Sequence, residues 1–196
     1  MISINTLLEG YRKGVFPMSV DGLINWYSPE HRGIIPLEDF HVPKRLSRLL
    51  RQRKFRATIN QDFIGVISAC ASRKNDSGNW IDENLITSYL ALHSVGHAHS
   101  IEVWSADQLV GGLYGVSLKG AFFGESMFHL TSNASKIALV VLIERLKERG
   151  YRLLDVQWLT PHLAGFGGVE IERNDYLNQL DNAMRFECHF DKTNIS

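Results

Sequence analysis

Apolar positions recur along this chain with a helical period in some segments and with the pattern of strands in others. The 3.6-residue spacing of apolar side chains, together with capping residues, predicts helices. Gly96 and Gly150 each follow such a segment, as is typical of a helix C-terminus. Helices are therefore predicted over residues 3–13, 44–56, 60–72, 82–95, 132–150 and 174–184.

The clearest β signal is a meander of three antiparallel strands between residues 100 and 128. Its segments read SIEVWS, QLVGGLYGVSL and AFFGESMF, and the dipeptides Ala-Asp and Lys-Gly between them predict tight turns. Shorter strands are predicted at 24–28, 33–37, 55–59 and 151–158. The chain thus runs through helices, a meander, a long helix and another strand. This order predicts an α+β fold and resembles the core of the acetyltransferase-like (GNAT) fold.

Composition adds a broad class to this picture. The 196 residues are 44% hydrophobic and 21% charged, which is ordinary for a globular protein. No apolar run approaches the roughly 20 residues that span a bilayer, and the N-terminus has no secretion signal, so a cytoplasmic protein without a membrane partner is expected. Cys70 and Cys188 lie far apart and outside any metal-type spacing, which favours free thiols in a reducing compartment.

Charge is distributed unevenly, although the formal net charge is zero. The segment 44–56, KRLSRLLRQRKFR, carries seven Lys and Arg and no acid, which leaves the rest of the chain at −7. Leu46, Leu49 and Leu50 form one apolar stripe, so the cations lie on the outer face of a predicted helix. Two interpretations stay open: a solvated helix face, or a surface that binds nucleic-acid phosphates.

Three polar residues stand out in otherwise apolar strands. Asp155 and Gln157 alternate with apolar residues in YRLLDVQW and are predicted to share one face of the strand. Glu125 ends the meander in GESMF. It is either a strand-end carboxylate paired with an arginine, or part of an acidic cleft with Asp155 and Gln157 that suits a cationic substrate.

Two further patterns have ordinary explanations beside functional ones. The histidines in HSVGHAHS (His93, His97 and His99) resemble a metal set, but Gly96 separates them and no carboxylate has zinc-type spacing, so no metal site is expected. The segment SNASK opens the long helix where a CoA-dependent GNAT protein has a glycine-rich pyrophosphate loop. That loop is missing, which argues against an ordinary acetyltransferase, although Lys136 and the helix N-terminus still favour an anion.

With these residues in place, the chain resembles the bacterial leucyl/phenylalanyl-tRNA–protein transferase family. The likeness extends from about residue 7 to residue 177. HAHSIEVW, GESMF and D-x-Q in this order are jointly specific. The other shared segments are GYRKGVFP, WYSPEHRG, NWI, LVGGLYGV, NASKIAL, HLAGFG and EIERNDYL.

The resemblance implies an aminoacyltransferase that moves Leu or Phe from Leu-tRNA or Phe-tRNA to the α-amine of a protein beginning with Lys or Arg. The product is marked for degradation, and no cofactor and no metal take part. The resemblance also implies a small α/β N-terminal domain, placed here at residues 1–58 with the basic helix, and a GNAT-like catalytic domain at 59–196. A monomer is expected.

For the reaction that the resemblance implies, we assign roles to particular residues on chemical grounds, as hypotheses. Asp155 orients Gln157 and accepts or relays the proton, Gln157 hydrogen-bonds the attacking amine, and Glu125 holds the donor end or the acceptor. Trp80 stacks on the terminal adenosine, and the basic segment, through Lys44, Arg45, Arg48 and Arg51, holds acceptor-stem phosphates. The slot for the donor side chain is lined by Leu113, Phe122, Met127, Leu139, Leu142 and Leu146, although the last three are equally a core stripe of the long helix.

Departures from the family pattern, and two rival functions, remain open. Met18 replaces an aromatic residue of the family, and Gly165 and Gly168 replace Ser and Ala after the predicted site. The first rival is a GNAT-type N-acyltransferase that uses another acyl donor, such as CoA. The second is a non-catalytic tRNA-binding protein, which would need the basic segment but neither Asp155 nor Gln157.

Overall fold

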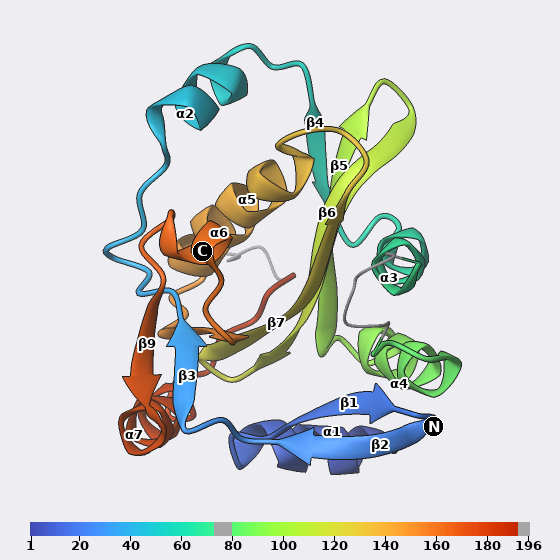
Figure 1. Ribbon diagram of the computed structural model, residues 1–196, viewed down its shortest axis with the longest axis vertical. Helices are drawn as coiled ribbons and strands as arrows, with labels where there is room; N and C mark the ends of the chain where they lie inside the picture. Colours follow the sequence, from blue (N-terminus) through green and yellow to red (C-terminus); the bar gives the residue numbers. More distant parts are fainter. Residues whose placement is uncertain (73–79, 192–196) are drawn as a thin grey trace.

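A seven-stranded sheet lies at the centre of the computed structural model, which describes residues 1–72 and 80–191 (Figure 1). The strands lie across the sheet in the order β4, β5, β6, β7, β8, β3, β9, and neighbours run antiparallel except for the parallel pair β7 and β8. The predicted meander is confirmed as β5, β6 and β7. The bounds are β3 His31–Ile34, β4 Arg56–Ile59, β5 Ala98–Ser105, β6 Gln108–Leu118, β7 Ala121–His129, β8 Leu153–Gln157 and β9 Val169–Glu172.

All six predicted helices are present, and α1, α3 and α4 begin at capping side chains. Asp62 accepts a hydrogen bond from the backbone N–H of Gly65 at 2.9 Å, and Asp82 accepts one from Leu85 at 2.8 Å. These bonds satisfy donors that the first turn of a helix leaves open. The helices are α1 Ile4–Arg12, α2 Lys44–Arg51, α3 Phe63–Ala71, α4 Glu83–Ser94, α5 Ala134–Glu148, α6 Pro161–Ala164 and α7 Arg173–Ala183. None of the helices in the described ranges is both long and apolar enough to cross a membrane.

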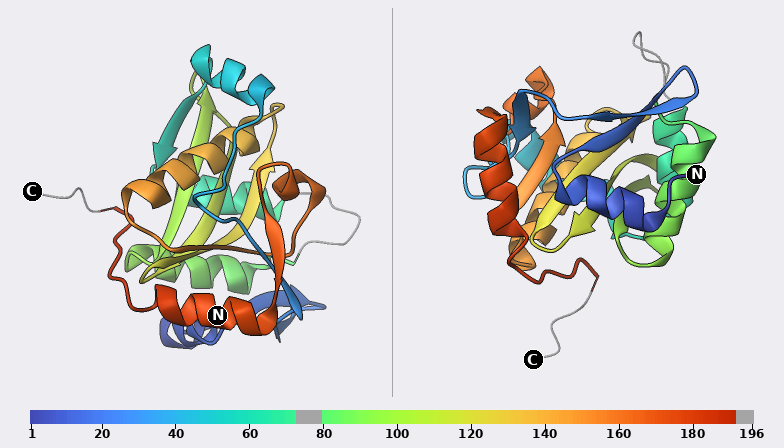
Figure 2. Two further views of the ribbon diagram at one scale, coloured as in Figure 1. Left: turned by 90° about the vertical axis from the view of Figure 1, so that its left-hand side faces the viewer. Right: turned by 90° about the horizontal axis from the view of Figure 1, so that it is seen from below.

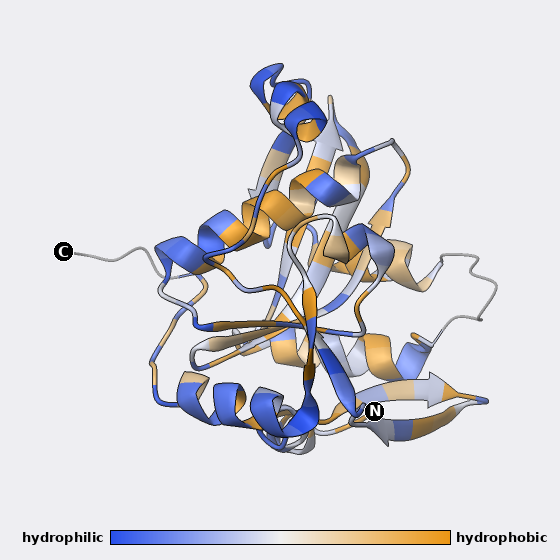
Figure 3. Ribbon diagram, turned by 60° about the vertical axis from the view of Figure 1, so that its left-hand side comes forward, coloured by the Kyte–Doolittle hydropathy of each residue, from blue (hydrophilic) through white to orange (hydrophobic). Residues whose placement is uncertain are grey.

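The helices cover the two faces of the sheet unequally. One face carries α1, α3, α4 and α7, and Figure 2 shows α7, α1 and α4 side by side when the molecule is seen from below. The other face carries α5, whose middle is apolar, whereas α2 mixes hydrophilic and hydrophobic residues (Figure 3). Both faces are therefore buried, which explains why the central strands are apolar on both sides.

The N-terminal segment adds a hairpin that the sequence does not predict in full. β1 Phe16–Val20 pairs antiparallel with β2 Leu23–Tyr27 in a separate two-stranded sheet. Pro17 suggests a break in the chain rather than a strand. A two-stranded ribbon tolerates proline because each strand has an unpaired edge. Figure 1 shows this hairpin next to α1, at the end of the molecule opposite α2.

The basic helix α2 is shorter than predicted and lies on the outside of the molecule. It ends at Arg51, and β4 then joins the edge of the large sheet. Leu46 is its buried anchor, worth about 2 kcal/mol if fully buried. The strands β3 and β4 both belong to the central sheet, while the predicted domain boundary at residue 58 stays a prediction.

Candidate active site

The site lies where the parallel strands β7 and β8 separate. Their paired residues are Ala121 to Phe123 on β7 and Leu153 to Asp155 on β8. Beyond this pairing a cavity of about 650 Å³ is lined by residues of both strands and by the start of α5. Splayed strands thus expose side chains that a continuous sheet would cover.

Glu125 reaches this cavity because it is the extra residue of a β-bulge. Gly115 of β6 pairs with Gly124, and Tyr114 pairs with Ser126, so Glu125 lies between two register positions. A bulge redirects a side chain and is frequent beside active sites. Position 115 must be glycine, because a Cβ there would lie 2.3 Å from the carbonyl oxygen of Phe123.

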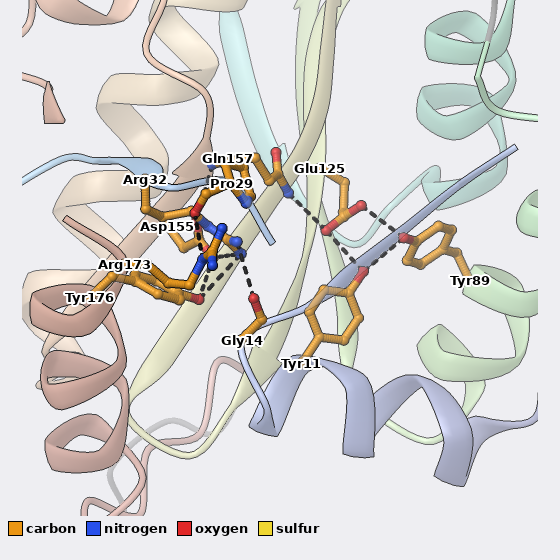
Figure 4. A network of polar contacts seen from close by, with 10 residues as sticks. All are labelled: Tyr11, Gly14, Pro29, Arg32, Tyr89, Glu125, Asp155, Gln157, Arg173 and Tyr176. Carbon is orange, nitrogen blue, oxygen red and sulfur yellow. Dashed lines mark hydrogen bonds and ion pairs between the residues drawn. The ribbon is translucent and has the colours of Figure 1, made fainter. Parts of the chain in front are cut away.

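Three neutral donors hold the Glu125 carboxylate (Figure 4). The Tyr11 hydroxyl donates to Oε1 at 2.9 Å, the Tyr89 hydroxyl donates to Oε2 at 2.7 Å, and Nε2 of Gln157 donates to Oε1 at 3.1 Å. Burial raises the pKa of Glu125 to about 7, although the hydrogen bonds from Tyr89 and Tyr11 oppose the rise. A carboxyl group with this pKa exchanges protons near neutral pH, as a general base must.

The two tyrosines keep their protons. Their hydroxyl oxygens lie 2.7 Å apart, Tyr11 on α1 and Tyr89 on α4. Burial, and then the charge of Glu125, raises the pKa of each well above its ordinary value of 10.0. Both hydroxyls therefore stay protonated near neutral pH and can donate to the ionised Glu125 carboxylate.

Asp155 shapes the end of β8 by a tight turn. Its Oδ1 accepts the backbone N–H of Gln157 at 2.9 Å, a bond that Asp side chains often make two residues ahead. Gln157 takes a φ of 60°, in the left-handed region that non-glycine residues seldom adopt. The regular strand geometry ends here, and the Gln157 amide points at Glu125 (Figure 4).

Arg32 of β3 fixes the Asp155 carboxylate in turn. Its Nε donates to Oδ1 at 2.9 Å and its Nη2 donates to Oδ2 at 2.7 Å, a bidentate pair. Tyr176 of α7 donates to Oδ2 at 2.7 Å. Counting the N–H of Gln157, each oxygen of Asp155 accepts two hydrogen bonds, so the carboxylate has little capacity left for a substrate.

The surroundings of Arg32 explain how a buried cation is tolerated. Its side chain is 1% exposed, and Nη1 donates to the carbonyl oxygen of Gly14 at 3.1 Å. The guanidinium carbon lies 4.7 Å from the ring centre of Phe16 and 4.4 Å from that of Tyr176. Burial lowers the pKa of Arg32, but the charge and hydrogen bonds of Asp155 more than offset this and leave it raised. Arg32 therefore keeps its positive charge.

The structure brings two of the three predicted polar residues together at the cavity and places the third behind them. Glu125 and Gln157 line the cavity, whereas Asp155 is fully buried and contacts the backbone of Gln157. The expected pairing of Glu125 with an arginine is not found: in the described residues it is Asp155 that pairs with one, and Glu125 is held by neutral groups.

The apolar wall of the cavity contains four of the six residues predicted for the donor slot. Leu113, Met127, Leu139 and Leu142 line it. Phe122 and Leu146 do not, since they pack in the core beyond the cavity, with the Phe122 ring 5.3 Å from that of Phe190. The cavity spans only the first turns of α5, so the helical stripe continues past it. Leu154, Val156 and Leu163 complete the wall without having been predicted.

A second wall of the cavity is formed mainly by aromatic side chains. The predicted Trp80 lies there together with Met18, which occupies the position where the family pattern has an aromatic residue. Phe16 and Trp158 were not predicted, and their rings meet edge to face at 5.0 Å. A flat base can stack on such a wall.

The predicted cations lie apart from this cavity. Lys44, Arg45, Arg48 and Arg51 are exposed on α2. Arg45 and Arg48 line a separate groove of about 490 Å³, whereas Lys44 and Arg51 do not line it.

The three histidines do not converge. Nδ1 of His93 lies 2.8 Å from the carbonyl oxygen of Ala98, and Nδ1 of His97 lies 3.0 Å from that of Ser117. His99 stacks on Phe190 instead, with ring centres 4.4 Å apart. Within residues 1–72 and 80–191 no group of three or more metal-ligating side chains occurs.

Sequence patterns did not identify the residues that support the site. Tyr11 and Tyr89 follow the apolar faces of their helices, so they resemble core residues. Tyr176 likewise lies on the apolar face of α7, and Arg32 lies in a short strand without a period. The available signal was Asp155 itself, because a carboxylate in an apolar strand needs a charged partner.

Comparison with a solved structure supports the fold. A GCN5-related glucosamine N-acetyltransferase region of a fungal multi-domain GH3 β-N-acetylglucosaminidase superposes with a TM-score of 0.50. It shares 14% identity and covers 83% of this chain and 21% of that one. At this identity the likeness shows the fold alone, and it confirms the prediction of a GNAT-like α+β architecture.

Sequence comparison identifies the family. The model of the leucyl/phenylalanyl-tRNA protein transferase matches residues 34–181, and the model of its N-terminal domain matches residues 1–30. A leucyl/phenylalanyl-tRNA–protein transferase of Chlorobium limicola is 49% identical and covers 97% of this chain and 100% of the relative. That of Maricaulis maris is 50% identical and covers 94% and 87%. The chain therefore belongs to the leucyl/phenylalanyl-tRNA–protein transferase family.

Proposed function

We propose that this protein transfers leucine or phenylalanine from the 3′ end of a charged tRNA to the α-amine of a protein that begins with Lys or Arg. The observation that carries the proposal is the chain of contacts from Arg32 through Asp155 and Gln157 to Glu125, at the mouth of an apolar cavity. The reaction takes place in the cytoplasm, where the protein acts as a monomer and its product is marked for degradation.

The chemistry needs little beyond positioning and proton transfer. An aminoacyl ester is already activated, so the proposed reaction uses neither a nucleotide cofactor nor a metal. The α-amine, with a pKa of about 7.7–8.0, is partly neutral at pH 7. What remains is to orient the amine, to remove its proton after attack and to stabilise the oxyanion.

Glu125 is assigned as the proton acceptor. As the C–N bond forms, one proton of the amine passes to the Glu125 carboxylate. As the C–O bond to the ribose breaks, the same proton passes to the leaving ribose oxygen, so Glu125 ends the cycle ionised. Its pKa of about 7 suits both steps, because the best base and acid at a given pH has a pKa close to it.

Gln157 is assigned to orient the amine. Its Nε2 is engaged by Glu125, while no described residue donates to its amide oxygen, which can therefore accept a hydrogen bond from the amine. Asp155 and Arg32 are positioning residues in this account: they hold Gln157 in its left-handed conformation and do not touch the substrate. This differs from a role for Asp155 in carrying the proton.

The donor occupies the remaining walls of the cavity. Its side chain lies against Leu113, Met127, Leu139 and Leu142, and the terminal adenosine stacks on the wall that contains Trp80. Branching at Cβ crowds such a slot, and a misplaced methyl group costs about 1–3 kcal/mol. Cations of α2 contact phosphates of the tRNA without reading its sequence.

The direct test mixes labelled Leu-tRNA or Phe-tRNA with peptides that differ only in their first residue. Transfer to peptides that start with Lys or Arg, and not to those that start with Ala or Asp, supports the proposal. Transfer from acetyl-CoA would favour the general acyltransferase instead. Binding of charged tRNA without transfer to any peptide would favour the non-catalytic function.

A further inference from the structure

Two hollows of the molecule share part of their lining at the start of α5. The groove of about 490 Å³ is lined by Pro43, Arg45, Leu46, Arg48, Leu49 and Gln52 of the α2 region and by Asn133 and Lys136. Asn133 and Lys136 also line the active-site cavity. The groove therefore begins where the cavity ends, and Lys136 stands at the junction.

Positive charge at this junction is not neutralised by the protein. Arg45 and Arg48 are exposed, and Lys136 is half-buried. Within the described part of the chain none of the three is ion-paired with a carboxylate. The helix α2 has basic residues in its last turn and no acid in its first. Unpaired cations around one groove attract a chain of negative charges.

A histidine on the cavity side of the junction adds a polar atom without a partner. The Nε2 atom of His162 is buried and has no hydrogen-bond partner among the described residues, and the side chain lines the cavity. Burial lowers the pKa of His162, and the charge of Lys136 lowers it further. His162 is therefore neutral at pH 7, and Lys136 supplies the charge where cavity and groove meet.

We propose that Lys136 binds the 5′-phosphate of the terminal adenosine of the donor, at the point where the cavity meets the groove that the proposed function assigns to tRNA phosphates. This inference rests on the proposed function, because it assumes that an aminoacyl-adenosine occupies the cavity. The RNA must leave that cavity, and among the described residues this groove offers an exit with cations that have no ion-pair partner. An acidic acceptor peptide in the same groove is the competing occupant.

The test compares two stable donor analogues, 3′-leucylamido-adenosine with and without a 5′-phosphate, by calorimetry. The wild-type protein is expected to bind the phosphorylated analogue about 10-fold more tightly, because a hydrogen bond between an ammonium and a phosphate is stronger than one between neutral groups. Lys136→Met should abolish this difference and leave the affinity for the unphosphorylated analogue unchanged. Lys147→Met, at the far end of the same helix, is the matched control and should retain the difference.

A second comparison tests whether the groove under α2 contacts the tRNA. Arg45→Gln combined with Arg48→Gln should leave both analogues unaffected but should weaken the binding of uncharged tRNA about 10-fold or more at low salt. In Lys136→Met the slope of log affinity against log salt for the same tRNA should fall by about 1.

Several results would overturn the inference. Equal binding of the two analogues by the wild-type protein would remove the phosphate site while leaving the proposed function intact. An equal loss of affinity for both analogues in Lys136→Met would indicate that the lysine contacts the aminoacyl end of the donor and not the phosphate. A Lys136→Met variant that binds both analogues and tRNA normally but loses affinity for acidic-tailed acceptor peptides would assign the groove to the peptide. If the wild-type protein binds neither analogue, the proposed function itself fails.

Discussion

Two buried carboxylates lie on neighbouring strands of the same sheet, and their surroundings differ in kind. Asp155 is 0% exposed and receives hydrogen bonds from a guanidinium, a hydroxyl and a backbone N–H. Glu125 is 7% exposed and receives hydrogen bonds from two hydroxyls and an amide. A full positive charge is hydrogen-bonded directly to the first carboxylate, whereas the described hydrogen bonds to the second come from neutral groups.

This difference separates their roles. An ion pair with good bidentate geometry offsets the cost of removing a carboxylate from water, so Asp155 serves as a fixed support. Neutral donors offset that cost only in part, so burial dominates at Glu125 and its pKa rises to about 7. The residue that exchanges protons is expected to be the one without a cation. The following experiments test this comparison, in order of expected effect.

The largest effect is expected from Glu125→Gln, which keeps the shape of the side chain and removes its basicity. Loss of a general base lowers kcat by about 10²–10⁴-fold. The KM for the donor should change little, because the slot and the adenosine wall are untouched. Glu170→Gln, an exposed carboxylate of β9, is the control and should have wild-type kcat. Full activity of Glu125→Gln would exclude Glu125 as the base.

Arg32→Lys changes the residue that holds Asp155 in place and leaves the proposed base, Glu125, unchanged. A lysine keeps the charge but cannot make the bidentate pair, so Gln157 loses its fixed position. We expect kcat to fall about 10-fold, with the KM for the donor unchanged and the kcat–pH profile keeping its shape. Breaking a buried pair outright, as in Arg32→Met, costs about 3–5 kcal/mol of stability. Arg173→Lys is the control, because the described hydrogen bonds of the Arg173 side chain go only to the backbone carbonyls of residues 28 and 29.

A loss of kcat in Arg32→Lys that comes with an equal rise in the donor KM would contradict the positioning role. It would indicate that Arg32 shapes the cavity as a whole. Normal kinetics in both Arg32→Lys and Asp155→Asn would show that Gln157 keeps its conformation without this support.

The donor slot can be tested with two identical substitutions one turn apart on α5. Leu142 lines the cavity and Leu146 packs behind it. Changing either to Ala should cost about 2–5 kcal/mol of stability. Only Leu142→Ala should raise the ratio of kcat/KM for Phe-tRNA over Leu-tRNA, by up to about 10-fold, because the larger slot suits the larger side chain. Equal changes of this ratio in both variants would indicate a general loosening of the core.

The smallest effect is a displacement along the pH axis. The rate rises with pH as Glu125 ionises, and the hydrogen bond from Tyr89 lowers the pKa of Glu125. Tyr89→Phe removes that bond, so the pKa rises and the rising limb of kcat moves to higher pH. Tyr176→Phe, which frees Asp155 of one donor, should leave the limb in place. If the rising part of the kcat–pH profile shifts in neither variant, it reflects the titration of the acceptor amine alone.

The architecture was largely predictable because it depends on repeated local signals. Apolar periods with glycine after the helices and tight turns in the meander placed α1, α3, α4, α5 and α7 and β5, β6 and β7 within a few residues. The elements that were missed are short or carry a contrary residue: α6 and β9 have four residues each, and β1 contains Pro17. Such segments are stabilised by neighbours distant in the sequence, which a local pattern does not record.

The site was predictable only where its residues differ from their surroundings. Glu125, Asp155 and Gln157 were recognised as polar residues in apolar strands and through the family resemblance. The bulge that aims Glu125 and the left-handed backbone of Gln157 depend on pairing with other strands. The division of the α5 stripe into slot and core, at Leu142 and Leu146, depends on where the cavity ends.

The most direct test of the account is a ¹³C NMR titration of the Glu125 carboxyl carbon, with the signal identified by its absence in Glu125→Gln. The account predicts a midpoint near pH 7. A midpoint near the ordinary value of 4.5 would mean that the neutral donors fully compensate the buried charge, and Glu125 would then be as fixed a support as Asp155.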